Sequence, residues 1–238
     1  MTRQLTGPAT VSPDRALLEV ADIAGELVRA HRAGVTRRDL RGCNIALVSC
    51  RARQRWPEFE RAAGELGARV TCLHDDASSI AASARLLGQL YNAIDCEYVD
   101  EATVREVDRS AGVPVLQGLA SGTPATRIVA MLLHLRKRAG KPLPGLRVVF
   151  AGDITSAQGE ALLGAAALGG IELALSPTLP TGSDAATRSS IAQGRPSLAN
   201  PRHTALPKAA DLVLEPHCTP SDQERRFALQ PVLLNALG

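Results

Sequence analysis

The stretch Asn44–Leu73, NIALVSCRARQRWPEFERAAGELGARVTCL, decides the fold because it contains a strand, a helix and a second strand in close succession. The apolar run Asn44–Ser49 is typical of a strand buried on both faces. The apolar spacing of Pro57–Leu66 predicts a helix, and Ala68–Leu73 predicts the next strand. This order predicts a parallel sheet whose strands are joined by helical crossovers.

The same alternation continues on both sides of this stretch. Ser12 and Asp14 can cap a preceding helix that runs to about His31. The elements predicted after the opening stretch are a helix over 79–91, a strand over 93–96, a helix over 101–110, a strand over 113–117 and a helix over 124–138. Together they predict an open parallel sheet flanked by helices, which forms a first domain over residues 1–140.

A breaker segment, Gly140–Gly145, separates this domain from a second one over residues 141–238. The second domain starts again with the strand Leu146–Ala151 and an alanine-rich helix over 156–168. Strands over 171–175 and 211–215 and a terminal helix over 221–237 follow, with a stretch rich in Pro, Gly and Ser between Pro177 and Asn200. The predicted fold class is therefore α/β, with two domains that each hold an open parallel sheet.

Composition excludes several classes of protein. The charges nearly balance, with 27 Lys and Arg against 24 Asp and Glu, and no basic tract with interleaved aromatic residues predicts nucleic-acid binding. The five cysteines lack the spacing of a zinc site or a disulfide framework, which predicts reduced thiols in the cytoplasm. We found no apolar run of signal-peptide or membrane-spanning length, no metal-ligand spacing and no dinucleotide fingerprint, and we expect neither a metal nor a cofactor.

Five segments occur in the order and with roughly the spacing found in the ornithine/aspartate carbamoyltransferase family, which this chain resembles over nearly its whole length. They are LLGQLYNAID (86–95), AGVPVLQGL (111–119), LRVVFAGDITSAQGEALLGAAALGG (146–170), ADLVLEPHCTP (210–220) and QERRFALQPVLLNAL (223–237). The chain is shorter than a full-length member, mainly between Pro177 and Asp211. The resemblance implies a carbamoyl-phosphate-binding domain, a shortened amino-acid-binding domain, and a last helix that returns to the first domain.

The resemblance also implies an anion site after the first strand. The family binds phosphate there with a Ser-Thr-Arg-Thr-Arg loop, and the matching residues here are Ser49, Cys50, Arg51, Ala52 and Arg53. The serine and both arginines match the motif, whereas both threonines are replaced. Backbone amides and guanidinium groups at a strand-to-helix turn suit an anion, and the alternative is a solvated basic turn.

The groups that polarise the carbonyl in the family are replaced. Glu97 stands where the family has an arginine, and Thr123 and Thr126 stand for the histidine and glutamine of a His-Pro-x-Gln turn. A carboxylate reverses the interaction with phosphate, so the sequence argues against ordinary carbamoyl transfer. Two interpretations of Glu97 stay open: an exposed loop carboxylate, or a new acid/base or cation-binding group. The two threonines are grouped with the candidate anion-binding residues.

The amino-acid site is partly kept. Asp153 and Thr155 lie in the turn after the second domain's first strand, His217 and Cys218 belong to a His-Cys-Thr-Pro turn, and Arg226 matches a family arginine. A His-Cys turn at the end of a strand lies where open α/β sheets bind ligands, and the alternative is a rigid structural turn with Cys218 as a small apolar side chain. Glu97 and Cys218 are the candidate catalytic residues.

These residues lead to two main hypotheses and a weaker third. The chain is either an enzyme that acts on a small amino-acid-like molecule, with a phosphate or carboxylate anion as a second ligand, or a non-catalytic homologue that assembles with an active carbamoyltransferase. The third hypothesis is residual carbamoyl transfer by a rearranged site. Because family members form trimers, the resemblance implies a homotrimer or an assembly with a homologous subunit.

Overall fold

The computed structural model describes residues 13–51, 56–176 and 210–237, and these residues divide into two compact units. Unit 1 comprises the described residues up to Thr126 together with those from Asp222 onward, and unit 2 comprises those from Arg127 to Ser221. Both units contain a parallel sheet flanked by helices, which confirms the predicted α/β fold class. No helix among the described residues is both long and apolar enough to cross a membrane.

Sheet A of unit 1 has four parallel strands in the order β2-β1-β3-β4. They are β1 (Asn44–Ser49), β2 (Arg69–His74), β3 (Ala93–Glu97) and β4 (Val115–Gln117). The register of β1 and β3 places Leu47 beside Asp95 and Ser49 beside Glu97. Because side chains of paired residues point to the same face, these four residues share one face of the sheet.

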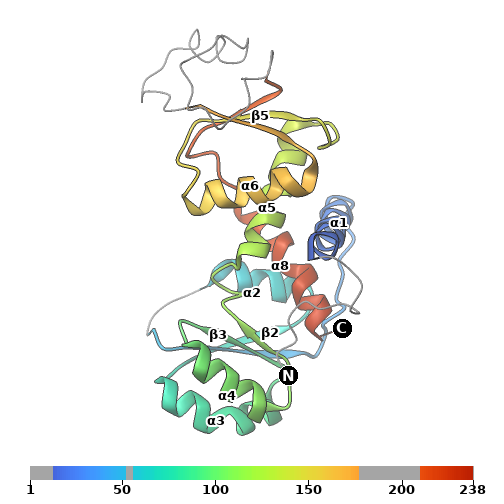
Figure 1. The fold of residues 1–238 in the computed structure, drawn as a ribbon. Coiled ribbons are helices and arrows are strands. Elements are labelled where there is room, and N and C mark those ends of the chain that lie inside the picture. Colours follow the sequence, from blue (N-terminus) through green and yellow to red (C-terminus); the bar gives the residue numbers. More distant parts are fainter. Residues whose placement is uncertain (1–12, 52–55, 177–209, 238) are drawn as a thin grey trace. The chain divides into compact units, whose positions relative to one another are not determined.

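Helices cover both faces of sheet A (Figure 1). On one face lie α3 (Ala77–Leu90) and α4 (Glu101–Ala111), and on the other lie α2 (Pro57–Glu65) and α8 (Asp222–Leu237). The helix α1 (Pro13–Arg32) packs against α8. The helices α3 and α4 begin at aspartate caps, because Asp76 and Asp100 accept the N–H groups of Ser79 and Thr103.

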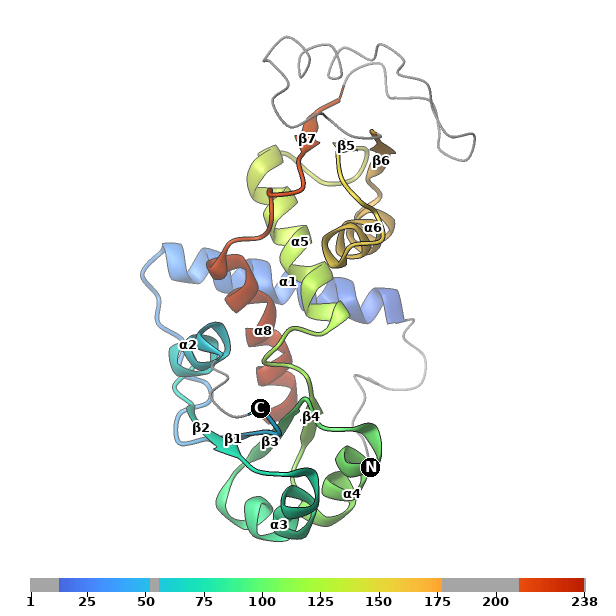
Figure 2. The same cartoon turned by 90° about the vertical axis from the view of Figure 1, so that its left-hand side faces the viewer.

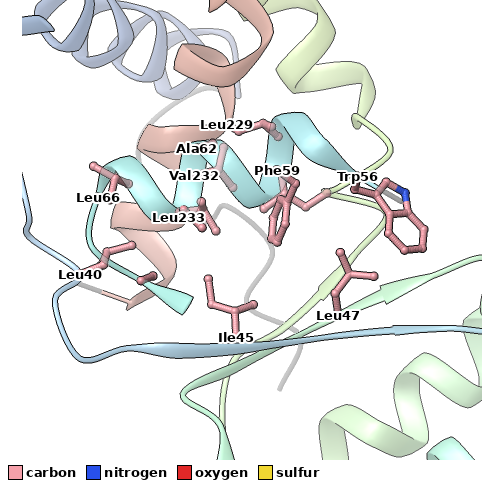
Figure 3. Packing of buried hydrophobic residues seen from close by; sticks show 13 residues of the cluster. Leu40, Ile45, Leu47, Trp56, Phe59, Ala62, Leu66, Leu229, Val232 and Leu233 are labelled. Carbon is pink, nitrogen blue, oxygen red and sulfur yellow. The ribbon is translucent and has the colours of Figure 1, made fainter. Parts of the chain in front are cut away.

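The core between sheet A, α2 and α8 brings together segments from opposite ends of the chain. Phe59 from α2 and Leu233 from α8 are fully buried over Ile45 of β1 (Figure 3). Burial of side chains of this size stabilises a fold by about 1.5–3 kcal/mol each. The last helix is therefore part of the core of unit 1.

The α3–α4 layer depends on a close approach of two backbones. A Cβ atom added at Gly88 of α3 would lie 1.7 Å from the carbonyl oxygen of Ala111, at the end of α4. Glycine is needed here because every other side chain would push α3 away from α4.

Sheet B of unit 2 has three parallel strands in the order β6-β5-β7 (Figure 2). They are β5 (Arg147–Phe150), β6 (Glu172–Leu175) and β7 (Leu212–Leu214). The helix α5 (Pro124–Ala139) begins in unit 1 and continues into unit 2, where it packs closely on α6 (Ala157–Gly169). A Cβ atom at Gly164 of α6 would lie 2.5 Å from the Cδ1 atom of Ile128, so glycine permits this packing.

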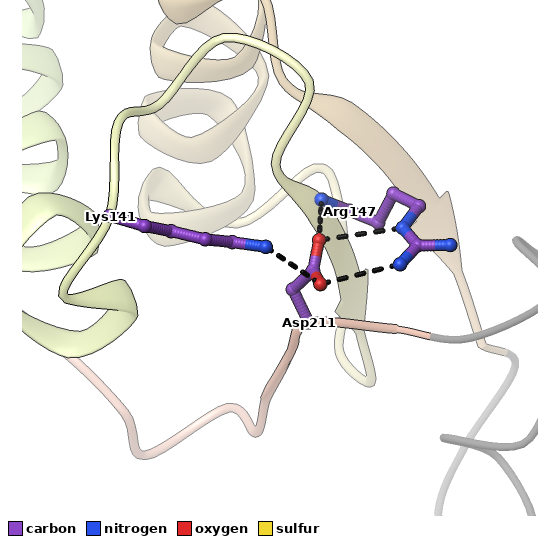
Figure 4. A network of polar contacts seen from close by, with 3 residues as sticks. All are labelled: Lys141, Arg147 and Asp211. Carbon is purple, nitrogen blue, oxygen red and sulfur yellow. Dashed lines mark hydrogen bonds and ion pairs between the residues drawn. The ribbon is translucent and has the colours of Figure 1, made fainter.

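A small polar network fixes the start of β7 to β5 (Figure 4). The carboxylate of Asp211 accepts the backbone N–H of Arg147 at 2.9 Å and lies 2.8 Å from the Nζ atom of Lys141. The Arg147 guanidinium also contacts it at 3.4 Å. These partners, the Lys141 ammonium first, hold the pKa of Asp211 well below its ordinary value. The network ties the segment before β5 to the start of β7.

Candidate functional site

Three chain segments meet at the carboxyl-terminal edge of sheet A, which we call edge A. They are the turn Ser49–Arg51 after β1, Glu97 and Tyr98 at the end of β3, and the loop 118–123 after β4. Parallel strands end at the same edge of a sheet, and ligands of open α/β folds bind there. Edge A therefore gathers most of the residues that the sequence predicted for the anion site.

The Ser49–Arg51 turn is held by its serine. Ser49 is fully buried, and its Oγ atom accepts the backbone N–H of Arg51 at 3.1 Å. Cys50 and Arg51 are exposed, and the Arg51 guanidinium lies 4.0 Å from the centre of the Tyr98 ring. Ala52 and Arg53, which the sequence also assigned to this site, lie outside the described residues. The described part of the turn presents one cation at edge A.

A pair of buried carboxyl groups holds the loop after β4. The two Asp95 carboxylate oxygens accept the N–H groups of Leu119 at 3.1 Å and Ala120 at 2.8 Å. Glu97 Oε1 accepts the N–H of Ser121 at 2.9 Å, and the Glu97 side chain also forms a hydrogen bond with the Asp95 carboxyl group. Glu97 is only 1% exposed, so its interpretation as an exposed loop carboxylate is wrong. β3 extends one residue beyond its predicted end and takes Glu97 into the sheet.

Burial and neighbouring charges shift the pKa values of Asp95 and Cys96. Burial, followed by the nearby Glu97 charge, raises the pKa of Asp95 to about 7, although two backbone N–H bonds act in the opposite direction. Burial, followed by the Asp95 charge, raises the pKa of the Cys96 thiol to about 12. Asp95 therefore changes charge near neutral pH, and Cys96 stays a neutral thiol.

Edge A also carries carboxylates near Cys50. Burial and then the charges of Asp76, Asp100 and Asp75 raise the pKa of the Cys50 thiol. Hydrogen bonds from Ser78 and Thr103 lower the pKa values of Asp76 and Asp100, so both carboxylates are ionised at neutral pH. Reactive cysteines need the opposite, an electropositive surrounding, so the structure argues against Cys50 as a nucleophile.

Thr123 and Thr126 form a closed local arrangement at the start of α5. The N–H of Thr126 donates to Thr123 Oγ1 at 3.2 Å, and the Thr126 hydroxyl donates to the carbonyl oxygen of Thr123 at 2.9 Å. Thr126 is 4% exposed. These contacts cap the helix and engage both side chains within the turn.

The carboxyl-terminal edge of sheet B, which we call edge B, brings together the turn after β5 and the turn after β7. Asp153 accepts both the N–H and the hydroxyl of Thr155, at 2.9 and 2.7 Å. The side chain of Gln158 on α6 donates to the carbonyl oxygen of Cys218 at 3.1 Å. This bond links α6 to the His-Cys turn, so four of the five predicted amino-acid-binding residues lie on the two turns of one edge.

The side chains of the His-Cys turn differ in exposure. The His217 side chain is 77% exposed, and its Nε2 atom lies 3.1 Å from the Glu215 carboxylate. Cys218 is half-buried, and its N–H donates to the carbonyl oxygen of Glu215 at 2.9 Å. The turn is thus held by its backbone, and its histidine faces solvent.

Arg226 lies in unit 1, on α8, and contacts α2. Its Nη1 atom donates to the Glu65 carboxylate, whose other oxygen accepts the Gln230 side chain at 2.8 Å. The structure therefore gives Arg226 a partner that binds α8 to α2. Its role toward an amino acid stays a prediction.

Asp95 and Tyr98 also belong to edge A and were not predicted from the sequence. The alternation in Ala93–Glu97, in which Ile94 and Cys96 are apolar and Asp95 and Glu97 are acidic, was the available signal for a buried acidic pair on one face of a strand. The described residues contain no group of three or more His, Cys, Asp and Glu side chains placed to hold a metal ion.

Comparison with known proteins agrees with this architecture. No family model matches the chain. It is 35% identical over 162 residues to a catabolic ornithine carbamoyltransferase of Clostridium perfringens, across 66% of this chain and 49% of that protein. A putative aspartate carbamoyltransferase structure from Trypanosoma cruzi shares the fold, with a TM-score of 0.62, 16% identity and coverage of 99% of this chain and 100% of that one.

A structure of aspartate transcarbamoylase from Trypanosoma cruzi in complex with carbamoyl phosphate gives a TM-score of 0.60 at 16% identity, over 96% of this chain and 93% of that one. Each unit of this chain has a parallel sheet flanked by helices, and the candidate ligand-binding turns lie at the carboxyl-terminal edge of each sheet. The chain belongs to the ornithine/aspartate carbamoyltransferase family. It spans about half the length of the curated relatives that it matches.

Proposed function

We propose that this chain is a carbamoyltransferase-family protein with a degenerate carbamoyl phosphate site, which binds a simple oxyanion at edge A and acts on a small amino-acid-like substrate. The observation that carries this proposal is the buried Glu97 carboxylate. It occupies the position where the family resemblance implies an arginine, and it lies beside Ser49 in the sheet register. Carbamoyl phosphate is the ligand in the related Trypanosoma cruzi complex, and a carboxylate at this position repels its phosphate.

Charges around Glu97 support the same conclusion. Asp95 lies on the same face of β3, and Asp75, Asp76 and Asp100 act electrostatically on Cys50 in the adjoining turn. Arg51 is the cation that the described part of the Ser49–Arg51 turn offers against them. A dianion such as carbamoyl phosphate is therefore disfavoured relative to an anion with a single negative charge.

The side chains that would stabilise a developing oxyanion are also missing. Thr123 and Thr126, at the position of the family's His-Pro-x-Gln turn, are bonded to each other's backbone and hydroxyl groups. Loss of one oxyanion donor reduces transition-state stabilisation by about 2.7–4 kcal/mol, and an arginine, a histidine and a glutamine are replaced together here. The proposal therefore excludes ordinary carbamoyl transfer.

Edge B is the proposed place for the amino-acid-like substrate. Asp153, Thr155, His217 and Cys218 lie on its two turns, and Gln158 joins the turn after β7 to α6. The exposed His217 imidazole and the half-buried Cys218 thiol are the groups with chemical reactivity there. In this proposal Cys218 and Glu97 remain the candidate catalytic residues.

A second candidate function is a non-catalytic homologue that assembles with an active carbamoyltransferase, either as a trimer or with a homologous subunit. The observation that favours it is the contact of Arg226 with the Glu65 carboxylate, whose other oxygen accepts the Gln230 side chain. An arginine that already binds a carboxylate of its own chain is less available to a substrate carboxylate.

Calorimetric titration with carbamoyl phosphate, phosphate, ornithine and aspartate tests the proposal, with citrulline and carbamoyl-aspartate assayed in the same samples. We expect binding of an anion or an amino acid without either product. Arg51→Ala should abolish anion binding, whereas Arg109→Ala, which removes an exposed helix arginine paired with Glu106, should not. Formation of citrulline or carbamoyl-aspartate would contradict the proposal, and absence of all binding would favour the non-catalytic homologue.

A further inference from the structure

Tyr98 has an unusual backbone conformation. Its φ angle is +54°, and it is the one residue other than glycine with a positive φ in the part of the chain that the structure describes. This region is unfavourable for a bulky side chain, and such strain persists only where the surroundings impose it. Tyr98 is also 43% exposed, so burial of its ring in a core does not explain the conformation.

Tyr98 lies between two fixed groups. Glu97 precedes it directly and is fixed by the Ser121 N–H at 2.9 Å. On the other side, the Tyr98 ring lies under the Arg51 guanidinium, with 4.0 Å between the guanidinium carbon and the ring centre. The left-handed backbone thus turns the ring from the end of β3 toward the turn after β1.

Arg51 is consequently held at two places. Its backbone N–H donates to the buried Ser49 hydroxyl at 3.1 Å, and its guanidinium stacks on the Tyr98 ring. Stacking uses the face of the guanidinium, while the N–H donors point outward in its plane and suit a bidentate oxyanion. A side chain that is already ordered loses less conformational entropy when a ligand binds.

We propose that Tyr98 is a positioning residue that orients the Arg51 guanidinium to receive an oxyanion, either a phosphate or a carboxylate. This inference rests on the proposed function, because it requires an anion site at edge A. It adds a residue outside the Ser-Thr-Arg-Thr-Arg-like turn to that site.

Two variants separate positioning from structural support. Tyr98→Gly removes the ring and is compatible with a positive φ, whereas Tyr98→Phe keeps the stacking ring. We expect Tyr98→Gly to weaken phosphate or acetate binding by about three- to tenfold, while its melting temperature stays within about 2 °C of the wild type or rises. Tyr98→Phe should retain both the affinity and the melting temperature. Calorimetric titrations with inorganic phosphate and with acetate, made separately, identify which oxyanion the site prefers.

The outcomes distinguish this inference from the proposed function. If the wild-type chain binds an oxyanion and Tyr98→Gly binds it equally well, the inference is overturned and the anion site stands. A fall of the melting temperature that accompanies the loss of affinity would also overturn it, because the ring would then act through packing. If the wild-type chain binds neither phosphate nor acetate, the anion site itself fails and the inference fails with it.

Discussion

Edge A and edge B lie at equivalent ends of two parallel sheets, yet their polar groups are organised in opposite ways. At edge B, Asp153 accepts two hydrogen bonds from Thr155, and Gln158 satisfies the carbonyl oxygen of Cys218. At edge A, the strand β3 carries the acidic side chains of Asp95 and Glu97 into the interior, where they are hydrogen-bonded to each other and accept backbone N–H groups of the loop after β4. Edge B is stabilised by local bonds, whereas edge A brings two buried acidic groups together, which is costly when both are ionised.

The difference indicates where function constrains the sequence. Ionising both members of a buried carboxyl pair is costly, because desolvation and mutual repulsion oppose the second charge. Native proteins retain such groups mainly where they serve binding or catalysis. The buried acidic pair therefore marks edge A as a candidate site, and its function stays a prediction.

The largest expected effect comes from breaking the scaffold under edge A. Gly88→Ala should destabilise unit 1 by about 3 kcal/mol or more, since the new Cβ atom would overlap the carbonyl oxygen of Ala111. Hydrogen exchange should then show lost protection in β3 while β5 of unit 2 keeps its protection. The matched control is Gly64→Ala, where nothing lies within 4 Å of the added Cβ atom and a gain of about 0.5–1 kcal/mol is expected. Wild-type stability of Gly88→Ala would contradict the close α3–α4 packing.

Glu97→Gln removes one of the two buried carboxyl groups at edge A and so measures how much their repulsion destabilises unit 1. The carboxamide oxygen of this variant can still accept the Ser121 N–H, and its NH₂ group can donate to Asp95, so repulsion is replaced by a charge-assisted hydrogen bond. We expect the free energy of unfolding at pH 8 to rise by about 1–3 kcal/mol. Chemical denaturation of both proteins measures this difference, and a destabilised variant would show that the carboxylate is structural.

The pH dependence of the same pair gives a second test. The pKa of Asp95 is about 7 in the folded chain, above its ordinary value of 3.8, so the folded state prefers the protonated form. The free energy of unfolding should therefore fall as the pH rises from about 4 to 7. Glu97→Gln should reduce this slope, because it removes the charge that helps to raise the Asp95 pKa. Equal slopes in denaturation series of both proteins would show that the Glu97 charge has little influence.

At edge B a smaller, pH-independent effect is expected. Ser156→Ala removes the hydroxyl that accepts the Gly159 N–H and caps α6, and should lower the free energy of unfolding of unit 2 by about 1 kcal/mol. Thermal denaturation at several pH values measures it. Ser110→Ala, at an exposed position in α4, is the control and should be nearly neutral. A pH-dependent loss at Ser156 would mean that edge B also depends on a titrating group.

The sequence predicted the fold well because hydrophobic periodicity acts locally. The strand over Asn44–Ser49 and the helix starting at Pro57 occur where they were predicted, and the fold class is confirmed. Glu97 was harder to place, because its burial depends on whether β3 continues past Cys96. The positive φ of Tyr98 could not be predicted, since left-handed backbone is uncommon for a tyrosine and no local sequence pattern indicates it.

The position of α8 has a consequence for synthesis of the chain. Leu229, Val232 and Leu233 of α8 close the core over β1 and α2, and residues 127–221 of unit 2 are translated before them. Domains generally fold in the order in which they emerge from the ribosome. The apolar face of sheet A, however, is covered only after the last helix has been synthesised. Unit 1 begins first and is completed last, so we expect a chain that lacks α8 to leave Phe59 and Ile45 uncovered.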